Sequence, residues 1–511
     1  KKEDNDLSVC PKIKFPAIRV NNLQINNPQV HYYTVTENGA TSITWQDNEA
    51  KSKIHLQYIR SSDGQTIEIG NSNLTSQGIA VLTANKHLLK SDNGSFAIEL
   101  DNTLLTATET GSIEWETHLK HFTANKLVFD SLQENKTGSL VINKARLSNI
   151  TIKPLYLLRP YDLISNNADF SLSEVTGSYQ NDLNRFNWYN LRYQKSNSSF
   201  TIDSFAYSPL MSRDEFVKQL QYQADYLQAK TKSIHIGPFN WDQYIKDSSF
   251  NVGSIVINDG YISTFRDKRI PRHEGAVKPL PVGRLKSIPI KLSVDSITLQ
   301  NGLVQYEEIN EKTNSVGRIN VNRLNSKIYN AGNYDHTATD SLYIYAHADL
   351  ENVIATDLYV AQSYLDSNSG FYMTVDMGEA DLTSINPILA SLASAKFKSG
   401  KIDSLKMQVT GNDDYAYGTM DMKYKDIRIQ LFKNGDETNK NVLTRVISFV
   451  ANTFVIKRNN KNRTAIVFFE RLKDRSSINY LVKTTLNGVI NSTGATSKSK
   501  QRKKYKRALK K

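Results

Sequence analysis

The chain has 511 residues, of which 39% are apolar, and a formal net charge of +13. This length excludes a small disulfide-stapled scaffold, and the single cysteine, Cys10, excludes an intramolecular disulfide and a zinc site built from several cysteines. Residues 498–511 carry nine Lys or Arg and no acid, so the remaining 497 residues hold only +4 (13 − 9), which argues against a basic nucleic-acid-binding face.

Residues 17–210 are predicted to form mostly β-strands. Short alternating stretches such as 54–58 (IHLQY) and 96–100 (FAIEL) are separated by clusters of Asn, Asp, Gly and Ser. Alternate side chains of a strand face the same side of a sheet, and the polar clusters provide turns. The N-terminal two-fifths of the chain is therefore expected to be β-rich.

One sequence phrase recurs without gaps at 254–264 (SIVINDGYIST) and 296–306 (SITLQNGLVQY), and more loosely at 22–32 (NLQINNPQVHY). Each copy is interpreted as a strand, a tight turn and a second strand, because an Asn-Gly or Asp-Gly pair adopts positive φ at low cost. Repeated hairpins of this kind extend a sheet by addition. Such pairs are also common in unrelated β proteins, so the matches alone do not establish a repeat architecture.

Helical periodicity is limited to four segments. The ranges 212–229, with Ser212 as N-cap, and 383–395 each place apolar residues on one stripe, and 441–450 is a further candidate. The clearest amphipathic pattern lies between Ile478 and Ile490. Beyond Gly494 the chain becomes rich in Ser, Lys and Arg, which predicts a disordered tail.

The motifs of common enzyme classes are missing from the sequence. No glycines are spaced as in a dinucleotide-binding loop, a Walker A loop or a nucleophile elbow. The close pair His118 and His121 falls in a strand-like region at a spacing that puts the side chains on opposite faces. We therefore predict no catalytic residues, no metal site and no cofactor. A glycosidase with two carboxylates from distant strands stays open.

The C-terminal region resembles the AsmA-like family of bacterial envelope proteins, in the style of Bacteroidota members. The resemblance covers 380–490 and, more weakly, 250–380. It rests on the order of the segments 386–389 (NPIL), 399–405 (SGKIDSL), 411–412 (GN), 416–420 (AYGTM), 424–431 (YKDIRIQL), 448–452 (SFVAN), 459–460 (NN), 469–471 (FER) and 480–488.

The resemblance implies a mainly β fold, with an elongated, curved antiparallel sheet that forms an open hydrophobic groove with a few short helices. It also implies a periplasmic protein of a Gram-negative bacterium, anchored to the inner membrane by a segment upstream of residue 1. The expected organisation is a β-rich groove segment at 1–210, a helix-containing insertion at 211–250, an AsmA-like groove with capping helices at 251–495 and a disordered basic tail at 496–511.

The function implied by the resemblance is non-enzymatic lipid binding and transfer that supports phospholipid traffic to the outer membrane and envelope integrity. Bringing ~30 methylenes of a two-chain lipid into water costs about 24 kcal/mol, at about 0.8 kcal/mol each, so such traffic needs a continuous apolar surface. The candidate lining residues are Ile255, Ile257, Ile297, Leu299, Val304, Tyr306, Ile427, Ile429 and Leu431.

Alternatives remain for these features. An ordinary sandwich core would show the same apolar pattern, which keeps a structural or adhesive envelope protein as the second hypothesis. The expected partners are phospholipid acyl chains and the inner or outer membrane surface, without nucleic acid. The last helix and the basic tail either lie on anionic lipid or cap an exposed sheet edge.

Overall fold

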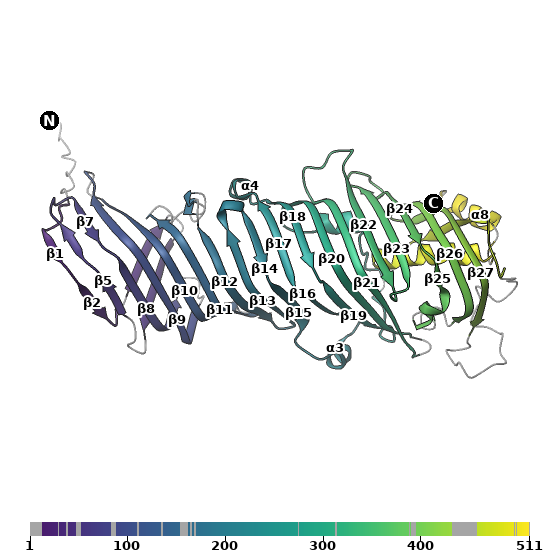
Figure 1. The fold of residues 1–511 in the computed structure, drawn as a ribbon, viewed down its shortest axis with the longest axis horizontal. Coiled ribbons are helices and arrows are strands. Elements are labelled where there is room, and N and C mark those ends of the chain that lie inside the picture. The colour runs from purple at the N-terminus through teal and green to yellow at the C-terminus, as the bar shows by residue number, and fades with distance from the viewer. Residues whose placement is uncertain are drawn as a thin grey trace, which may run out of the picture. The chain divides into compact units, whose positions relative to one another are not determined.

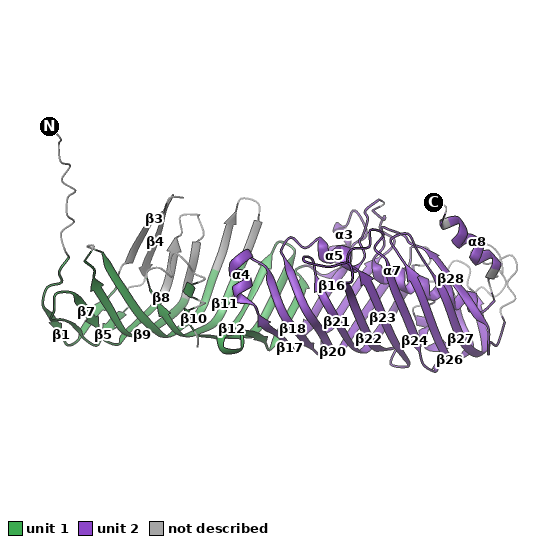
Figure 2. Cartoon of the chain, turned by 90° about the horizontal axis from the view of Figure 1, so that it is seen from above, with its two compact units in different colours: residues 1–210 green, residues 211–511 purple. Residues whose placement is uncertain are grey.

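The computed structural model describes residues 13–509 apart from 29, 37–38, 48–52, 83–87, 110–111, 134–135, 154–161, 164–165, 168–169, 274, 312–313, 388, 390–394, 432–456, 495 and 497. The chain is mainly β and divides into two compact units, Lys1–Leu210 and Met211–Lys511 (Figures 1 and 2). The strands of each unit are joined edge to edge into a sheet.

In unit 1 the sheet is formed by short strands near the N-terminus and by longer strands after residue 72. The described elements are β1 (Ile18–Val20), β2 (Leu23–Asn26), β3 (Val30–Thr36), β4 (Gly39–Asp47), β5 (Lys53–Leu56), β6 (Ile59–Ser61), β7 (Thr66–Ile69), β8 (Ser72–Leu82), β9 (Leu88–Ala107), β10 (Ile113–Gln133), β11 (Lys136–Ile152), β12 (Ser171–Asn181), β13 (Asn184–Gln194), η1 (Lys195–Asn197), β14 (Ser199–Ile202) and β15 (Ser204–Pro209).

Unit 2 adds short helices to its sheet. The described elements are α3 (Arg213–Gln219), β16 (Tyr226–Thr231), β17 (Ser233–Phe239), α4 (Trp241–Asp247), β18 (Phe250–Asn258), β19 (Tyr261–Asp267), α5 (Pro281–Lys286), β20 (Leu292–Ile309), β21 (Val316–Gly332), β22 (Ser341–Leu350), β23 (Ile354–Ser363), β24 (Phe371–Met377), β25 (Ala380–Asp381), η2 (Leu382–Ile385), β26 (Ala395–Gly411), β27 (Tyr415–Leu431), β28 (Thr464–Glu470), α7 (Ser477–Ser492) and α8 (Lys498–Ala508).

The sheets are mostly antiparallel, with one parallel exception in unit 2. The mainly β, mostly antiparallel sheet agrees with the prediction, and within it β18 and β19 both run parallel to β20. The parallel register follows the sequence repeat: Ser254 pairs with Ser296 and Tyr261 with Leu303, both 42 residues apart (296 − 254 and 303 − 261). The two aligned copies of the phrase are therefore neighbours in the sheet, matched residue by residue.

The predicted hairpins within these copies are wrong. Asn301 has φ 53° and Asp259 has φ 50°, so the positive φ expected there is present, but β20 continues through Asn301 as one strand. The register between β20 and β21 shifts around Gly302, which marks a β-bulge instead of a reversal. In the loose third copy Asn27, with φ 54°, likewise separates β2, which pairs with β5, from β3, which pairs with β4.

The predicted helices have mixed outcomes. The segment 212–229 is helical only as α3, which begins with a capping box between Ser212 and Glu215, and its residues from Tyr226 onward belong to β16, which pairs with β19. In the segment 383–395 the described residues form η2 and a short helical continuation at 386, 387 and 389. The segment 441–450 lies outside the described residues.

The last amphipathic helix is confirmed as α7, whereas the described part of the predicted disordered tail forms α8. α7 packs on one face of the last strands, since a Cβ on Gly488 would meet Met420 and Val467 within 3.0 Å. α8 reaches the other face, where the Tyr505 ring stacks on Tyr417 at 3.8 Å. The two helices thus lie on opposite faces of β28, because α7 meets Val467 and α8 meets Phe468.

The densest core of unit 2 lies beneath α7 and η2. Met407 is 1% exposed there and packs in one cluster with buried residues of β24, β26, β27 and β28. Adjacent Lys406 points to the opposite face and is exposed.

We predict that Met407→Ala lowers the free energy of unfolding of unit 2 by about 2–5 kcal/mol, because it leaves a cavity in a closed core. The matched variant Lys406→Ala is expected to change it by less than about 0.5 kcal/mol. Urea denaturation followed by circular dichroism compares the two, and equal effects would contradict this assignment of the core.

Candidate functional site: an apolar sheet face

An unbroken apolar row crosses unit 2 from β17 to β28. Each of its residues is the register partner of the next, so all of their side chains lie on the same face of the sheet. We call this row the inner stripe of unit 2. It consists of Ile236, Ile255, Ile297, Ile328, Ile344, Val360, Met373, Val409, Gly418 and Val467.

A second row runs beside the inner stripe, two residues further along each strand. Its side chains are large and apolar at Ile234, Ile257 and Leu299 and small at Ser326 and Ala346. It returns to large apolar side chains at Leu358 and beyond. The continuation is Leu358, Val375, Met407, Met420 and Ala465.

Four of the predicted lining residues, Ile255, Ile257, Ile297 and Leu299, lie in these two rows, on directly paired strands. Val304 lies on the same face beyond the bulge, because both β20 and β21 contain one extra residue there and the alternation is restored. Ile262 of β19 pairs with Val304 and joins this face.

The other predicted lining residues do not line the half-exposed part of the stripe. Ile427 is buried beside Leu382 of η2, and Ile429 packs against the same closed core. Leu431 ends β27, and its side chain lies outside the described residues. Tyr306 lies on the inner face, but its hydroxyl donates to Glu308 at 2.6 Å, and burial, followed by the charge of Glu308, raises the Tyr306 pKa.

Sequence reasoning missed the middle of the stripe, Ile328, Ile344, Val360 and Met373. Each lies in a strand of alternating character, as in Lys327-Ile328-Tyr329 and Tyr343-Ile344-Tyr345, so the alternation was a usable signal. The register was the missing information, because a shift by one residue would place these side chains on the opposite face.

The inner face is covered at one end and partly exposed at the other. Over β24 to β28 the stripe residues are buried beneath α7 and η2. From β17 to β22 the isoleucines of the stripe are only half-buried, and on the same face Ile262 is 39% and Leu227 37% exposed. Proteins rarely leave a contiguous apolar surface of this kind uncovered without a binding role.

The connection between β19 and β20, residues 268–291, forms a strap on the inner side. Parallel strands need a long crossover, and this one carries α5 across the sheet. The Val282 amide donates to the Gln362 side chain of β23 at 3.1 Å, and Lys286 Nζ donates to the Tyr364 carbonyl at 2.6 Å. In Figure 2 α5 and α7 lie on the same side of the strands β20 to β27.

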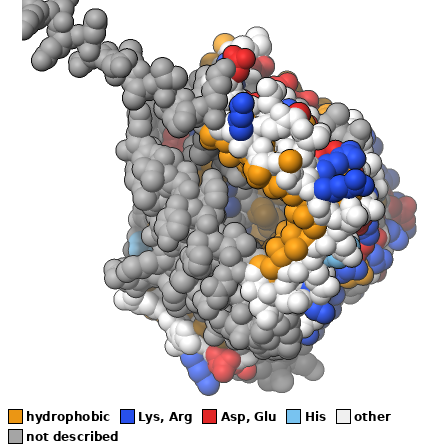
Figure 3. All heavy atoms as spheres, turned by 90° about the vertical axis from the view of Figure 1, so that its left-hand side faces the viewer, with side chains coloured by type: hydrophobic (Ala, Val, Ile, Leu, Met, Phe, Trp, Pro, Cys, Tyr) orange, Lys and Arg blue, Asp and Glu red, His pale blue; other side chains and the backbone are white. Residues whose placement is uncertain are grey.

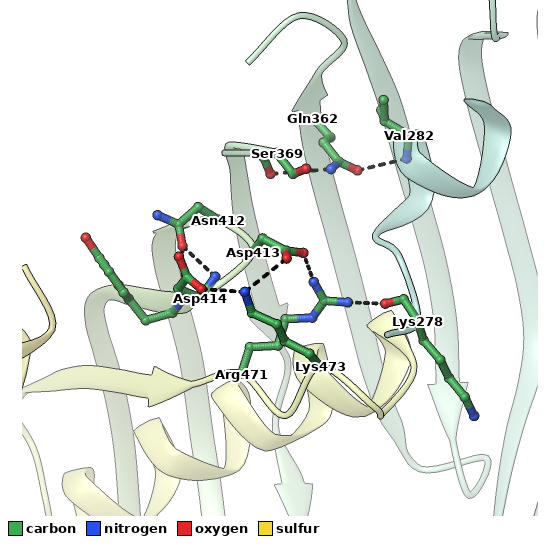
Figure 4. Close-up of polar contacts among 10 residues, drawn as sticks. Lys278, Val282, Gln362, Ser369, Asn412, Asp413, Asp414, Arg471 and Lys473 are labelled. Atoms are coloured by element: carbon green, nitrogen blue, oxygen red, sulfur yellow. Dashed lines mark hydrogen bonds and ion pairs between the residues drawn. The ribbon is translucent and has the colours of Figure 1, made fainter. Parts of the chain in front are cut away.

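Arg471 holds the strap near Lys278. Its fully buried guanidinium pairs with the Asp413 carboxylate and donates to the Lys278 carbonyl, as Figure 4 shows. The Lys278 amide also donates to the Lys473 carbonyl at 2.8 Å. Lys473 pairs with both Asp413 and Asp414 from a half-exposed position, and in the same view the Lys278 side chain points away from this cluster.

Unit 1 has an apolar row of its own. Its residues are register partners on neighbouring strands: Ile25, Ile54, Leu74, Ile98, Phe122, Leu147, Leu172, Tyr193 and Phe200. Figure 3 shows hydrophobic side chains gathered in a curved band beside a hollow at the end of this unit. Most members of the row are half-buried, and Tyr193 is buried, with its ring centroid 4.5 Å from that of Phe200 and 5.3 Å from that of Phe170.

The opposite face of unit 2 carries a row of tyrosines, of which Tyr329, Tyr345 and Tyr372 are exposed and Tyr359 is half-buried. Tyr329, Tyr345, Tyr359 and Tyr372 come from four adjacent strands, with successive ring centroids 6.0, 4.9 and 6.2 Å apart. Beside them is a concavity of about 630 Å³ whose lining includes the hydrogen-bonded pair His347 and Asp357. Such cross-strand aromatic pairs stabilise a sheet.

In comparisons with known proteins, neither protein-family models nor curated proteins match this chain. Within the described ranges, no group of three or more His, Cys, Asp or Glu is placed to hold a metal ion. Among the helices that the structure describes, none is long and apolar enough to cross a membrane.

We predict that Arg471→Met loosens the strap and lowers the free energy of unfolding by about 1–3 kcal/mol, because the half-buried Asp413 carboxylate and the Lys278 carbonyl lose the donor between them. Hydrogen exchange of residues 278–286 should accelerate. Lys473→Met removes the half-exposed cation from the same carboxylate, and it is expected to lower the free energy of unfolding by at most about 1 kcal/mol. Unchanged exchange in Arg471→Met would show that this residue does not hold the strap.

Proposed function

We propose that this chain is a non-enzymatic lipid-binding protein that holds phospholipid acyl chains against the inner stripe of unit 2. The observation that carries the proposal is the half-exposed part of the stripe, a run of isoleucines on consecutive strands from β17 to β22. Binding there removes both the acyl chain and the isoleucines from water, at about 25 cal/mol per Å² of apolar surface.

The resemblance to AsmA-like proteins supports the biological setting of this proposal. In that setting the protein works in the periplasm of a Gram-negative bacterium, anchored to the inner membrane, and supports phospholipid traffic to the outer membrane and envelope integrity. The sheet supports it physically, because adjacent strands extend the apolar surface without interruption. A lipid can thus move along the stripe and exchange one apolar contact for an equivalent one.

We predict that the triple variant Ile297→Asn, Ile328→Asn, Ile344→Asn loses most of the phospholipid that co-purifies with the unmodified chain. Three half-buried apolar side chains, each worth about 1.5–3 kcal/mol when fully buried, are replaced by polar ones. Mass spectrometry of lipid extracted after mild detergent purification gives the amount per protein.

The matched control is Thr298→Asn, Lys327→Asn, Tyr345→Asn. These residues are the immediate chain neighbours of the three isoleucines, and they pair with one another on the opposite face. The control should retain lipid at the level of the unmodified chain, with circular dichroism confirming that both triples keep the β fold. Equal retention in both triples, or an unmodified chain without lipid, contradicts the proposal.

A second candidate function, surface contact by a structural or adhesive envelope protein, is favoured by the exposed tyrosines of the opposite face. Tyr345 is 46% exposed at the centre of this row. Under this function the control triple, which removes Tyr345, would be the damaging one, and the stripe triple would leave attachment to the partner surface intact.

The proposal includes contact with an anionic membrane surface through α8. Arg502, Lys503, Lys506 and Arg507 of this helix are exposed. Each Lys or Arg near such a surface contributes about 1 kcal/mol.

We predict that changing these four residues to Gln weakens binding to vesicles containing phosphatidylserine by at least about tenfold, with little effect on neutral vesicles. Vesicle co-sedimentation at two salt concentrations measures the change. A variant that still binds anionic vesicles as tightly as the unmodified chain would assign the surface contact to another part of the molecule.

A further inference from the structure

The inner face of β20 changes from apolar to charged along its length. Ile297, Leu299 and Val304 are followed on the same face by Tyr306 and Glu308. At ~3.3 Å per residue, Glu308 lies about 13 Å beyond Val304. A lipid has the same order of chemistry, because its apolar chains end in a polar headgroup.

The acidic groups at this charged end are already paired. Glu308 is 1% exposed, accepts a hydrogen bond from the Tyr306 hydroxyl and pairs with Lys268. Asp225 accepts two hydrogen bonds from the Arg266 guanidinium, with Nε to Oδ1 at 2.7 Å. Arg266 itself is the register neighbour of Glu308 on β19. Both carboxylates are therefore matched by cations of the same sheet.

Two further lysines come from elements that meet on the inner side, since Leu280 of the strap and Tyr480 of α7 pack in one buried cluster. Lys278 comes from the strap and Lys483 from α7, and both are half-buried. Within the part of the chain that the structure describes, neither forms an ion pair with a carboxylate. Burial lowers the pKa of both lysines, and the nearby charges of Arg266 for Lys278 and Lys268 for Lys483 lower it further.

Arg475 adds a third cation to the group. Its charge also lowers the pKa of both lysines, and its guanidinium donates to the Gln223 side chain at 3.3 Å. Gln223 in turn donates to the carbonyls of Lys268 and Ile270 at the start of the strap. The charged end thus combines five cations, Arg266, Lys268, Lys278, Arg475 and Lys483, with two carboxylates, Asp225 and Glu308.

An excess of cations over carboxylates in a half-buried site is unfavourable, because the cations lose hydration and repel one another. An anion that accepts hydrogen bonds from several directions relieves both costs, and a phosphate group is such an anion. The position of these cations beside the apolar part of β20 fits a phosphate that is joined to acyl chains.

We propose that Lys278 and Lys483 bind the phosphate of a glycerophospholipid headgroup whose acyl chains run along the inner face of β20 from Val304 toward the inner stripe. This inference rests on the proposed function and adds the headgroup class and the direction of the lipid along β20. The strap, which carries Lys278, and α7, which carries Lys483, then close over the headgroup.

The test compares two lipids that differ only in the phosphate, phosphatidic acid and diacylglycerol with identical acyl chains, on the lipid-stripped protein. Isothermal titration gives their affinities. Phosphatidic acid should bind at least about tenfold more tightly than diacylglycerol. In the double variant Lys278→Gln, Lys483→Gln the preference should fall to within about twofold while diacylglycerol binding is retained. Lys423→Gln, an exposed lysine of β27, is the control.

The outcomes separate this inference from the proposed function. If diacylglycerol and phosphatidic acid bind the unmodified chain equally, or if the preference survives in the double variant, the headgroup site is wrong while acyl binding stands. If neither lipid binds, the proposed function itself fails. Inorganic phosphate that binds as tightly as phosphatidic acid would identify a site for the free anion and overturn the lipid assignment. The comparison in the unmodified chain decides the question even if the double variant does not fold.

Discussion

Strand register is the constraint on which the molecule depends. An alternating strand has one apolar face, but a continuous apolar surface arises only when every neighbour is aligned so that its apolar residues face the same side. In unit 2 this alignment holds from Ile236 of β17 to Val467 of β28. The bulges at Asp259 and Asn301 preserve it, because the two parallel copies carry the extra residue at the same aligned position.

The parallel copies also explain the strap. Because β19 and β20 run in the same direction, the chain must return along the sheet between them, and it does so on the inner side. The segment that lies over the apolar face is thus a consequence of the repeat itself. Its attachment combines polar contacts through Arg471 and Gln362 with the apolar side chain of Leu280, which is buried against Ala416 and Tyr480.

Much of the fold followed from local sequence patterns, and the parts that did not have identifiable causes. The β-rich character, the α7 amphipathic pattern and the Ser212 N-cap depend on neighbouring residues, so they could be predicted. The Asn301-Gly302 pair was correctly expected to give positive φ, but whether such a residue reverses a strand or bulges it depends on the neighbouring strand. α8 was missed because its composition is that of a disordered tail, while Gln501 and Tyr505 form contacts with α7 and β27 that the local pattern does not contain.

The residues that line the site were likewise only partly predictable from the sequence. Ile255 and Ile297 could be predicted because they occupy equivalent positions in the sequence repeat. Predicting Ile328 and Ile344 would have required the strand register. Ile427 showed the same apolar alternation, yet the structure buries it beneath η2, since covering depends on elements distant in sequence. Alternation therefore identifies an apolar face and does not show which part of it is covered.

The most direct test of the central claim is to locate a bound acyl chain on the sheet. A phospholipid with a photoreactive diazirine in its acyl chain, bound to the unmodified protein and activated by light, labels the residues that it contacts, and peptide mass spectrometry identifies them. The account predicts adducts at Ile255, Ile297, Ile328 and Ile344. Adducts at Thr298, Lys327 and Tyr345 on the opposite face, or labelling without preference for either face, would contradict it.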